Sequence, residues 1–215
     1  CGMVISQFLY VLGIQYTSPT NASVVGTTTP VMTFILASIF LQHRVTWLRI
    51  SGFLLASIGA LVLILGSGGG LSGNPLGDML CFVSQFSVAC YFVFFGEVLR
   101  RYHPVTVMKW LFLIATVLTL LPMYSRLDAL PSTTFSLSEL LAIAYVVMGG
   151  SFLSYLLLIV GQRHLEPPTV AAYNYVQPVI AAVVGIVLGL DIITWQKCLS
   201  LLLIASGVLL ISRKT

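Results

Sequence analysis

The chain has 215 residues, of which 58% are hydrophobic and only 7% are charged, and its formal net charge is +4. Soluble domains carry about 25% charged residues, so this composition cannot cover a water-exposed surface and excludes a soluble globular protein. The sequence therefore predicts an all-α integral membrane protein.

Uncharged stretches recur at the length of about 20 residues that crosses about 30 Å of hydrocarbon. In chain order, the expected spans cover residues 2–16, 19–42, 49–66, 79–96, 104–124, 140–162, 167–190 and 193–212. The first is short, and we interpret it as a helix cut by the start of the sequence. Three spans qualify if Arg49, Lys109 and Lys197 reach back to the membrane surface. Seven full spans and a partial eighth are predicted.

Basic residues gather on one side of this alternating arrangement. One face collects Arg44, Arg49, Arg100, Arg101, Lys109, Arg163, Arg213 and Lys214, whereas the other collects only Arg126 and Lys197. Because cytoplasmic loops carry an excess of lysine and arginine, the first face and the C-terminus are predicted to be cytoplasmic. Residues 67–78 then form an external linker, and we expect a bacterial-type inner (plasma) membrane.

Few residues in the chain suit catalysis or metal binding. The three histidines lie at the predicted cytoplasmic rim: His43, His103 and His164. The four cysteines, which form no CxxC pair, are interpreted as small apolar fillers: Cys1, Cys81, Cys90 and Cys198. We expect no cofactor, metal or nucleic-acid partner, and the oligomeric state stays open. A membrane-embedded structural subunit and an intramembrane enzyme remain as alternatives to a transporter.

The two parts of the chain share a pattern, because a shift of 148 positions lays Pro30 on Pro178. The same shift pairs Gly13 with Gly161, Pro19 with Pro167, Val31 with Val179, Thr46 with Thr194, Trp47 with Trp195, Gly59 with Gly207 and Leu61 with Leu209. Trp47 falls on the arginine-rich side and Trp195 on the opposite side. The two copies are therefore predicted to be inverted in the membrane.

The shift also sets the extent of each copy. Residues 1–66 hold the last three helices of the first copy, and residues 79–215 hold the five helices of the second. Matching the copies requires two further helices ahead of residue 1. We therefore expect ten spans in two inverted five-helix repeats, of which eight are present here. Inverted repeats of this kind recur in secondary transporters, which bind substrate near the membrane midplane.

These repeats resemble a known family. The stretch "YTSPTNASVVGTTTPVMTFILASIFLQHRVTWLRISGFLLASIGALVLIL" is similar to the EamA-type half-repeat of the drug/metabolite transporter superfamily. The stretch "EPPTVAAYNYVQPVIAAVVGIVLGLDIITWQKCLSLLLIASGVLLIS" resembles its second copy. The resemblance implies a ten-helix exporter or importer of small metabolites. It also implies coupling to a gradient rather than to ATP. A proton and sodium are the candidate coupling ions, and the choice between them stays open.

Pro30 and Pro178 each lie inside a predicted span. Proline removes its own N–H donor and frees the carbonyl four residues earlier, here those of Gly26 and Asn174, at a cost of about 3 kcal/mol. The hydroxyls of "GTTT" and the amides of "NYVQ" can satisfy the loose carbonyls. We interpret the pair as hinges that open a midplane site. A packing kink without further function is the alternative.

Polar and aromatic side chains near these prolines predict the lining of the site. Asn174 and Gln177 share a helix face, with Tyr173 and Tyr175 beside it. The predicted substrate-binding residues are Gln7, Tyr10, Tyr91, Ser151, Tyr155, Tyr173, Asn174 and Gln177. No carboxylate or lysine sits in the middle of a span, so the substrate is predicted to be neutral or zwitterionic.

Small residues that repeat at intervals of four predict close approach of helix backbones. They are Gly52, Ala56 and Ala60, then Gly185 and Gly189, with the "GGS" stretch at 149–151 assigned the same role. We expect these positions to serve packing of the helix bundle.

Overall fold

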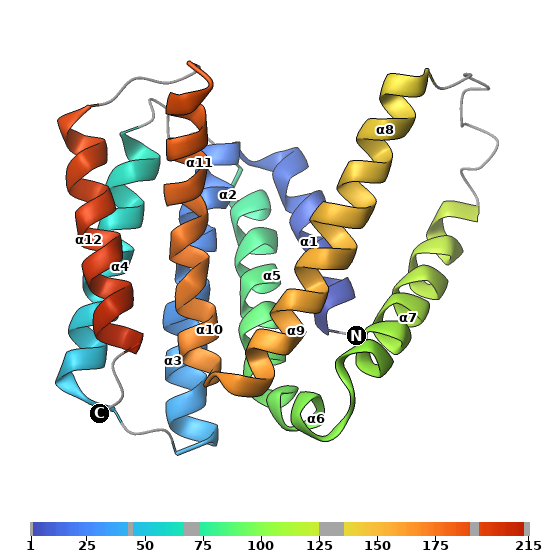
Figure 1. The fold of residues 1–215 in the computed structure, drawn as a ribbon, viewed down its shortest axis with the longest axis horizontal. Helices are drawn as coiled ribbons and strands as arrows, with labels where there is room; N and C mark the ends of the chain where they lie inside the picture. Colours follow the sequence, from blue (N-terminus) through green and yellow to red (C-terminus); the bar gives the residue numbers. More distant parts are fainter. Residues whose placement is uncertain (1, 43–44, 67–73, 125–135, 190–193, 213–215) are drawn as a thin grey trace. The chain divides into compact units, whose positions relative to one another are not determined.

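The computed structural model describes residues 2–42, 45–66, 74–124, 136–189 and 194–212, which are helical and contain no β-strand (Figure 1). The elements are α1 (Gly2–Tyr16), α2 (Pro19–Gly26), α3 (Thr28–Phe40), α4 (Trp47–Leu65), α5 (Pro75–Phe94), α6 (Gly96–Arg101), α7 (Pro104–Tyr124), α8 (Leu137–Tyr145), the π-helix η2 (Val146–Leu153), α9 (Ser154–His164), α10 (Pro167–Ala172), the 3-10 helix η3 (Tyr173–Tyr175), α11 (Val176–Val187) and α12 (Trp195–Ser212). Every predicted span corresponds to a helix or a run of consecutive helices, which confirms the all-α membrane fold.

Length and composition allow five helical stretches to cross a membrane: Pro19–Phe40, Trp47–Leu65, Pro75–Phe94, Leu137–His164 and Trp195–Ser212. Two shorter apolar helices cover Val4–Tyr16 and Pro104–Leu120. The predicted span at 167–190 is instead divided by the 3-10 turn η3. Cys1, residues 67–73 of the predicted linker, and Arg44, Arg126, Arg213 and Lys214 lie outside the described residues.

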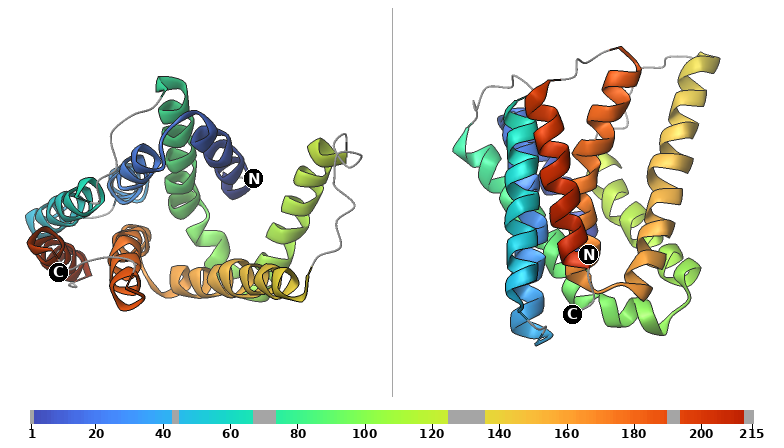
Figure 2. Two further views of the ribbon diagram at one scale, coloured as in Figure 1. Left: turned by 90° about the horizontal axis from the view of Figure 1, so that it is seen from above. Right: turned by 60° about the vertical axis from the view of Figure 1, so that its left-hand side comes forward.

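The chain divides into two compact units, a larger one of residues 2–95 and 166–215 and a smaller one of residues 96–165. In the larger unit α4 and α12 lie side by side, α1 packs along α5, and α3 contacts both α5 and α10 (Figures 1 and 2). In the smaller unit α9 packs against α6 and α7. Helix α5, the first helix of the second predicted repeat, therefore packs on helices of the first.

Equivalent helix starts confirm that the copies are inverted. Thr46 precedes α4 and accepts a hydrogen bond from the Arg49 N–H at 3.4 Å, while its mate Thr194 precedes α12. Helices α4 and α12 run antiparallel, so Trp47 and Trp195 begin them at opposite ends (Figure 1). Both indoles are largely exposed, at 86% and 79%, as expected for aromatic residues at a membrane interface.

Small residues bring α4 and α12 into backbone contact. A Cβ added at Gly207 would lie 2.6 Å from the Ala56 nitrogen, and one added at Gly59 would lie 2.9 Å from Ile204 Cγ1. The shift that relates Ala56 to Ile204 also relates Gly59 to Gly207, so these two contacts are counterparts of each other. The predicted packing role of Gly52, Ala56 and Ala60 is confirmed, since all three are buried.

We expect Gly207→Ala to destabilise the protein, because the added methyl group would overlap backbone atoms of α4. Overpacking of this kind costs about 1–3 kcal/mol. Thermal unfolding of the purified protein in detergent should therefore shift downward. Gly161→Ala is the control, because a Cβ there has no heavy atom within 4 Å. Equal unfolding temperatures for the two variants would contradict close packing of α4 on α12.

The other small residues behave differently. Added Cβ atoms at Gly149 and Gly150 would meet nothing closer than 3.9 Å, so the packing role predicted for 149–151 is wrong within the described residues. These glycines instead lie in the π-helix, where the Ser154 hydroxyl donates to the Gly149 carbonyl at 2.9 Å. Gly189 adopts a φ of +68°, which glycine tolerates, and ends α11 rather than packing a neighbour. The surroundings of Gly185 are outside the description.

Candidate functional site

Both proline-containing spans are interrupted, and the interruptions are equivalent in the two repeats. In the first, α2 ends at Gly26, Thr27 forms a turn, and α3 begins at Thr28. In the second, α10 ends at Ala172 and η3 occupies Tyr173–Tyr175 before α11 begins. The shift of 148 residues lays Thr27 on Tyr175. The predicted pair of helix breaks is therefore present.

The breaks do not lie at the prolines themselves. Pro30 and Pro178 each occupy the third position of the helix that follows the break. Each break lies at the residue four positions before the proline, because Gly26 ends α2 and Asn174 belongs to η3. These are the residues whose carbonyls a proline leaves without a helical donor.

Hydroxyl groups at the first break bond to nearby backbone carbonyls, although the partners are Val24 and Val25 rather than the predicted Gly26. Thr27 Oγ1 donates to the Val24 carbonyl at 2.7 Å, and Thr28 Oγ1 donates to the Val25 carbonyl at 2.6 Å. The second break differs. Within the described part of the chain, the amides of Asn174 and Gln177 make no hydrogen bond, so they do not have the compensating role that was predicted for them.

Tyr175 joins the two breaks. Its hydroxyl lies 3.0 Å from the Thr27 carbonyl and 2.7 Å from Ser57 Oγ on α4. The side chain is only 1% exposed and belongs to an apolar cluster with Phe53 and Ile204. Tyr175 was predicted to flank the amide face, but its ring is buried in the core with residues of α4 and α12, so it does not line a site there.

The other side of the second break is accessible. Tyr173 is 51% exposed, Gln177 is exposed and Asn174 is half-buried. Unlike the buried Tyr175, these three side chains are at least partly exposed, and their role in binding a ligand stays a prediction. A site with two amides and a phenol can form hydrogen bonds to polar groups and stack on apolar ones.

The remaining predicted residues fall into separate groups. On α1, Gln7 is exposed and Tyr10 is half-buried. Tyr91 on α5 is only 4% exposed and its ring stacks on Phe95 with centroids 5.3 Å apart, so it lies in the protein interior. In the smaller unit, Ser151 lies in the π-helix and Tyr155 meets Phe112 edge to face at 6.0 Å. Whether these groups line one cavity stays a prediction.

Sequence analysis missed Gln85 on α5. The hydroxyl of the buried Thr29 donates to its side-chain oxygen at 2.6 Å, and its nitrogen lies 4.0 Å from where a Cβ of Gly26 would be. The amide therefore borders the first break. The signal was available, because an amide in the middle of a span is costly unless it has a partner.

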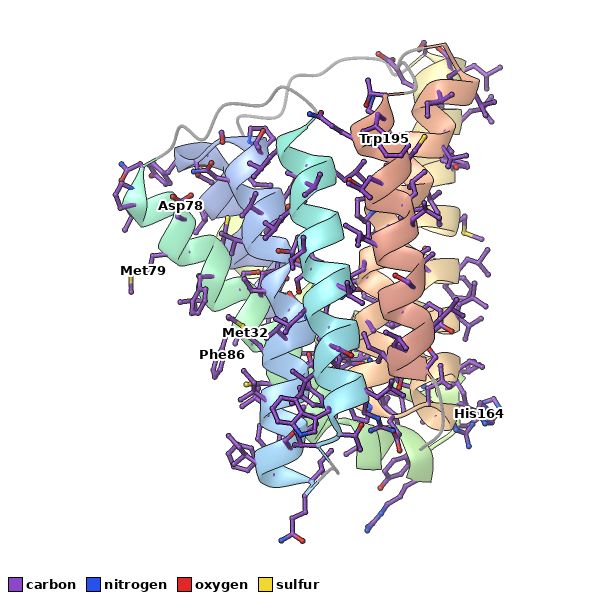
Figure 3. All side chains as sticks on the ribbon, turned by 90° about the vertical axis from the view of Figure 1, so that its left-hand side faces the viewer. Met32, Asp78, Met79, Phe86, His164 and Trp195 are labelled. Atoms are coloured by element: carbon purple, nitrogen blue, oxygen red, sulfur yellow. The ribbon has the colours of Figure 1, made fainter. Side chains whose placement is uncertain are left out.

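A second missed cluster links α5 to the junction of α1 and α2. The Thr17 hydroxyl donates to Asp78, and Asn21 Nδ2 donates to both Asp78 oxygens at 3.3 Å. Asp78 lies in the first turn of α5, where the helix dipole favours a negative charge. Figure 3 shows it near the same end of the larger unit as Trp195. Among the described residues, no group of three His, Cys, Asp or Glu side chains could hold a metal ion.

Two cations at equivalent positions of the two copies are buried against protein, while their predicted reach to the membrane surface stays a prediction. Arg49 and its repeat mate Lys197 are only 9% and 7% exposed. Arg49 forms an ion pair with Glu166 at 3.1 Å, and Glu166 directly precedes α10. The pair joins α4 of the first repeat to the start of α10 in the second.

The exterior of the larger unit is apolar. Figure 3 shows Met79 and Phe86 pointing away from α5, and these side chains are 65% and 44% exposed. Exposed leucine, isoleucine, valine and phenylalanine side chains continue this surface on the other helices. A surface of this kind is suited to lipid rather than to water.

Comparison with known proteins gives one family and several relatives. The model of the EamA-like transporter family matches residues 1–65 and 75–213. An uncharacterized transporter of Archaeoglobus fulgidus is 28% identical over 94% of this chain and 71% of its own length. The uncharacterized inner membrane transporter YedA of Escherichia coli strain K12 is 32% identical over 89% of this chain and 61% of its own length.

A protein of known crystal structure has the same fold. It superposes with a TM-score of 0.84 over 98% of this chain and 73% of that protein, at 18% sequence identity. At this identity the likeness concerns the fold alone. The chain spans less than two thirds of YedA, so activity and substrates of the whole protein are matters for proposal.

Proposed function

Because the chain belongs to the EamA-like transporter family, we propose that it forms the greater part of a secondary transporter for small neutral or zwitterionic metabolites. The observation that carries this proposal is the pair of repeat-related helix breaks, one of which presents Asn174 and Gln177 without partners in the described chain. Broken helices at the interface of inverted repeats are where secondary transporters bind their substrates.

The chemistry of the second break favours an uncharged or zwitterionic ligand. Asn174 and Gln177 offer both hydrogen-bond donors and acceptors, and the exposed Tyr173 ring adds an apolar face. The two buried cations lie at the helix starts, where Arg49 pairs with Glu166. A phosphorylated substrate would require a cation at the break itself, and none of the side chains of η3 supplies one.

Alternating access would use the breaks as hinges. A junction without continuous helical hydrogen bonds can change its angle at lower cost than an intact helix. The proposed motion opens the site to one side of the membrane and then to the other, driven by a proton or sodium gradient. A structural subunit would have no use for two amides without partners, and the family and relatives are transporters rather than enzymes.

Reconstitution tests this function. Proteoliposomes with the complete gene product should take up one or more radiolabelled compounds from a panel of neutral and zwitterionic metabolites. Uptake should need no ATP and should fall when an ionophore dissipates the proton or sodium gradient. Sugar phosphates serve as the charged control panel. Uptake of sugar phosphates alone, or of no compound in a panel that covers both classes, would overturn the proposal.

We further propose that the C-terminus is cytoplasmic and that the membrane is a bacterial inner membrane. Cysteine replacement at Trp195 should then react with an impermeant thiol reagent in intact cells, whereas replacement at Trp47 should react only after lysis. Both side chains are exposed and begin equivalent helices, so accessibility to the reagent is otherwise matched. The native cysteines would be replaced by alanine in both variants. The reverse labelling pattern would contradict the orientation.

A further inference from the structure

A hydrogen bond connects the two helix breaks of the larger unit. Thr27 and Tyr175 lie 148 residues apart, and the Tyr175 hydroxyl is 3.0 Å from the Thr27 carbonyl. This separation equals the shift that lays Pro30 on Pro178. Each residue of the bond is thus the repeat counterpart of the other.

A residue that contacts its own counterpart lies next to the axis that relates the two copies. Residues Ala56 and Ile204, also counterparts, share the same apolar cluster as Tyr175. Alternating access exchanges the conformations of the two repeats, so segments far from the axis move more than the two breaks do. The bond itself is not symmetric, because it runs from the side chain of Tyr175 to the backbone carbonyl of Thr27.

The Tyr175 hydroxyl both donates and accepts a hydrogen bond in this arrangement. A tyrosine hydroxyl has one proton, which it donates to the Thr27 carbonyl. Ser57 Oγ, at 2.7 Å, then donates its own proton to the tyrosine oxygen. One side chain thus ties together the first break, helix α4 and the second break. Its burial, with 1% of the side chain exposed, keeps water from competing for these bonds.

Tyr175 lies next to the proposed substrate-binding amides. It follows Asn174 directly and precedes Gln177 by two residues, and all three belong to η3 or the first turn of α11. The backbone of η3 has the tighter hydrogen bonds of a 3-10 helix in place of those of an α-helix, and Tyr175 is its buried side chain.

We propose that the Tyr175 hydroxyl is a positioning group, which holds the two breaks together at the axis between the repeats and fixes Asn174 and Gln177 toward the substrate. The inference rests on the proposed transport function for its substrate readout, although the tie between the breaks is independent of it. Tyr175→Phe removes only the hydroxyl and keeps the ring in the core. Tyr16→Phe is the matched control, because Tyr16 is 51% exposed at the end of α1.

Hydrogen exchange tests, without a substrate, whether the Tyr175 hydroxyl holds the two breaks together. In Tyr175→Phe the backbone amides near Tyr175 and those of Thr27–Thr29 should exchange about two- to tenfold faster, the loss expected for one neutral hydrogen bond. Amides in the middle of α4 and α12 should keep their wild-type rates. Faster exchange near Tyr175 alone, or a uniform increase across α4 and α12, would overturn the tie, because either result describes an ordinary core hydrogen bond.

Transport kinetics test the positioning role. For a substrate that the wild type carries, Tyr175→Phe should raise KM about three- to tenfold, while unfolding temperature and maximal rate change little. An unchanged KM in Tyr175→Phe, with a raised KM in Asn174→Leu, would overturn the positioning role but leave the transport function intact. Absence of transport by the wild type would instead refute the proposed function. Hydrogen exchange alone would then test whether the Tyr175 hydroxyl links the two breaks.

Discussion

Replacing Asn174 and Gln177 together by leucine is expected to lower apparent substrate affinity by about fivefold to a hundredfold. Each lost hydrogen bond to a neutral partner is worth about 0.5–1.5 kcal/mol, and a factor of ten corresponds to about 1.4 kcal/mol. The variant should still insert, since leucine suits the membrane better than an amide does. Uptake kinetics at equal surface expression would measure the loss.

Two features make this double variant specific. Neither amide has a hydrogen-bond partner within the described chain, so their loss leaves no protein group unsatisfied there. Gln15→Leu, which removes another exposed amide near the end of α1, is the control and should transport as the wild type does. A double variant with wild-type kinetics would reduce the second break to a packing kink and move the binding site elsewhere.

Reversing the charge of Arg49 is expected to destabilise the protein by about 3 kcal/mol. Arg49→Glu would place a second carboxylate beside Glu166 at a position where the side chain is only 10% exposed. Breaking a buried ion pair costs about 3–5 kcal/mol, and the lower end applies because Glu166 is 48% exposed. Thermal unfolding of the detergent-purified protein would measure this effect.

A double variant in which the two charges are exchanged separates the contribution of the ion pair from other effects of replacing Arg49. Arg49→Glu combined with Glu166→Arg should recover most of the lost stability, because opposite charges again face each other across α4 and the start of α10. Lys109→Glu reverses the charge of an exposed residue and should change stability little. If the exchanged pair were no more stable than the single reversal, the contact between the repeats would contribute nothing measurable.

The repeat was predictable because its informative residues mark helix starts. Pro19 begins α2, Pro167 begins α10, and the Thr-Trp pairs begin α4 and α12. Helix starts favour particular residues because of the local backbone conformation. The same residue types therefore recur at the same spacing in both copies. The small residues of α4 were predictable for a similar reason, since spacing by four positions places them on one face. Residues 149–151 are small, like those of α4, but they lie in a π-helix, which composition alone does not predict.

The position of each break was predictable from its proline. Gly26 and Asn174, whose carbonyls the prolines were expected to free, lie at the end of α2 and within η3. Which side of η3 faces the core is decided by tertiary contacts instead. Tyr173 and Tyr175 are two positions apart in the same turn, yet only the latter finds Thr27 and Ser57 as partners. Gln85 was missed because the search for polar lining residues began at Pro30 and Pro178, whereas the proline of α5, Pro75, lies at the start of that helix and far from Gln85 in sequence.

Substrate-dependent transport through the second break is the central claim. The most direct measurement compares small metabolites, inside and outside cells, between strains that produce the complete wild-type protein and strains that produce its Asn174→Leu/Gln177→Leu variant at the same membrane level. The account predicts that one or a few neutral or zwitterionic metabolites change distribution with the wild type and return to the level of empty cells with the variant. Identical metabolite distributions in wild-type and empty cells, or an unchanged effect in the variant, would contradict it.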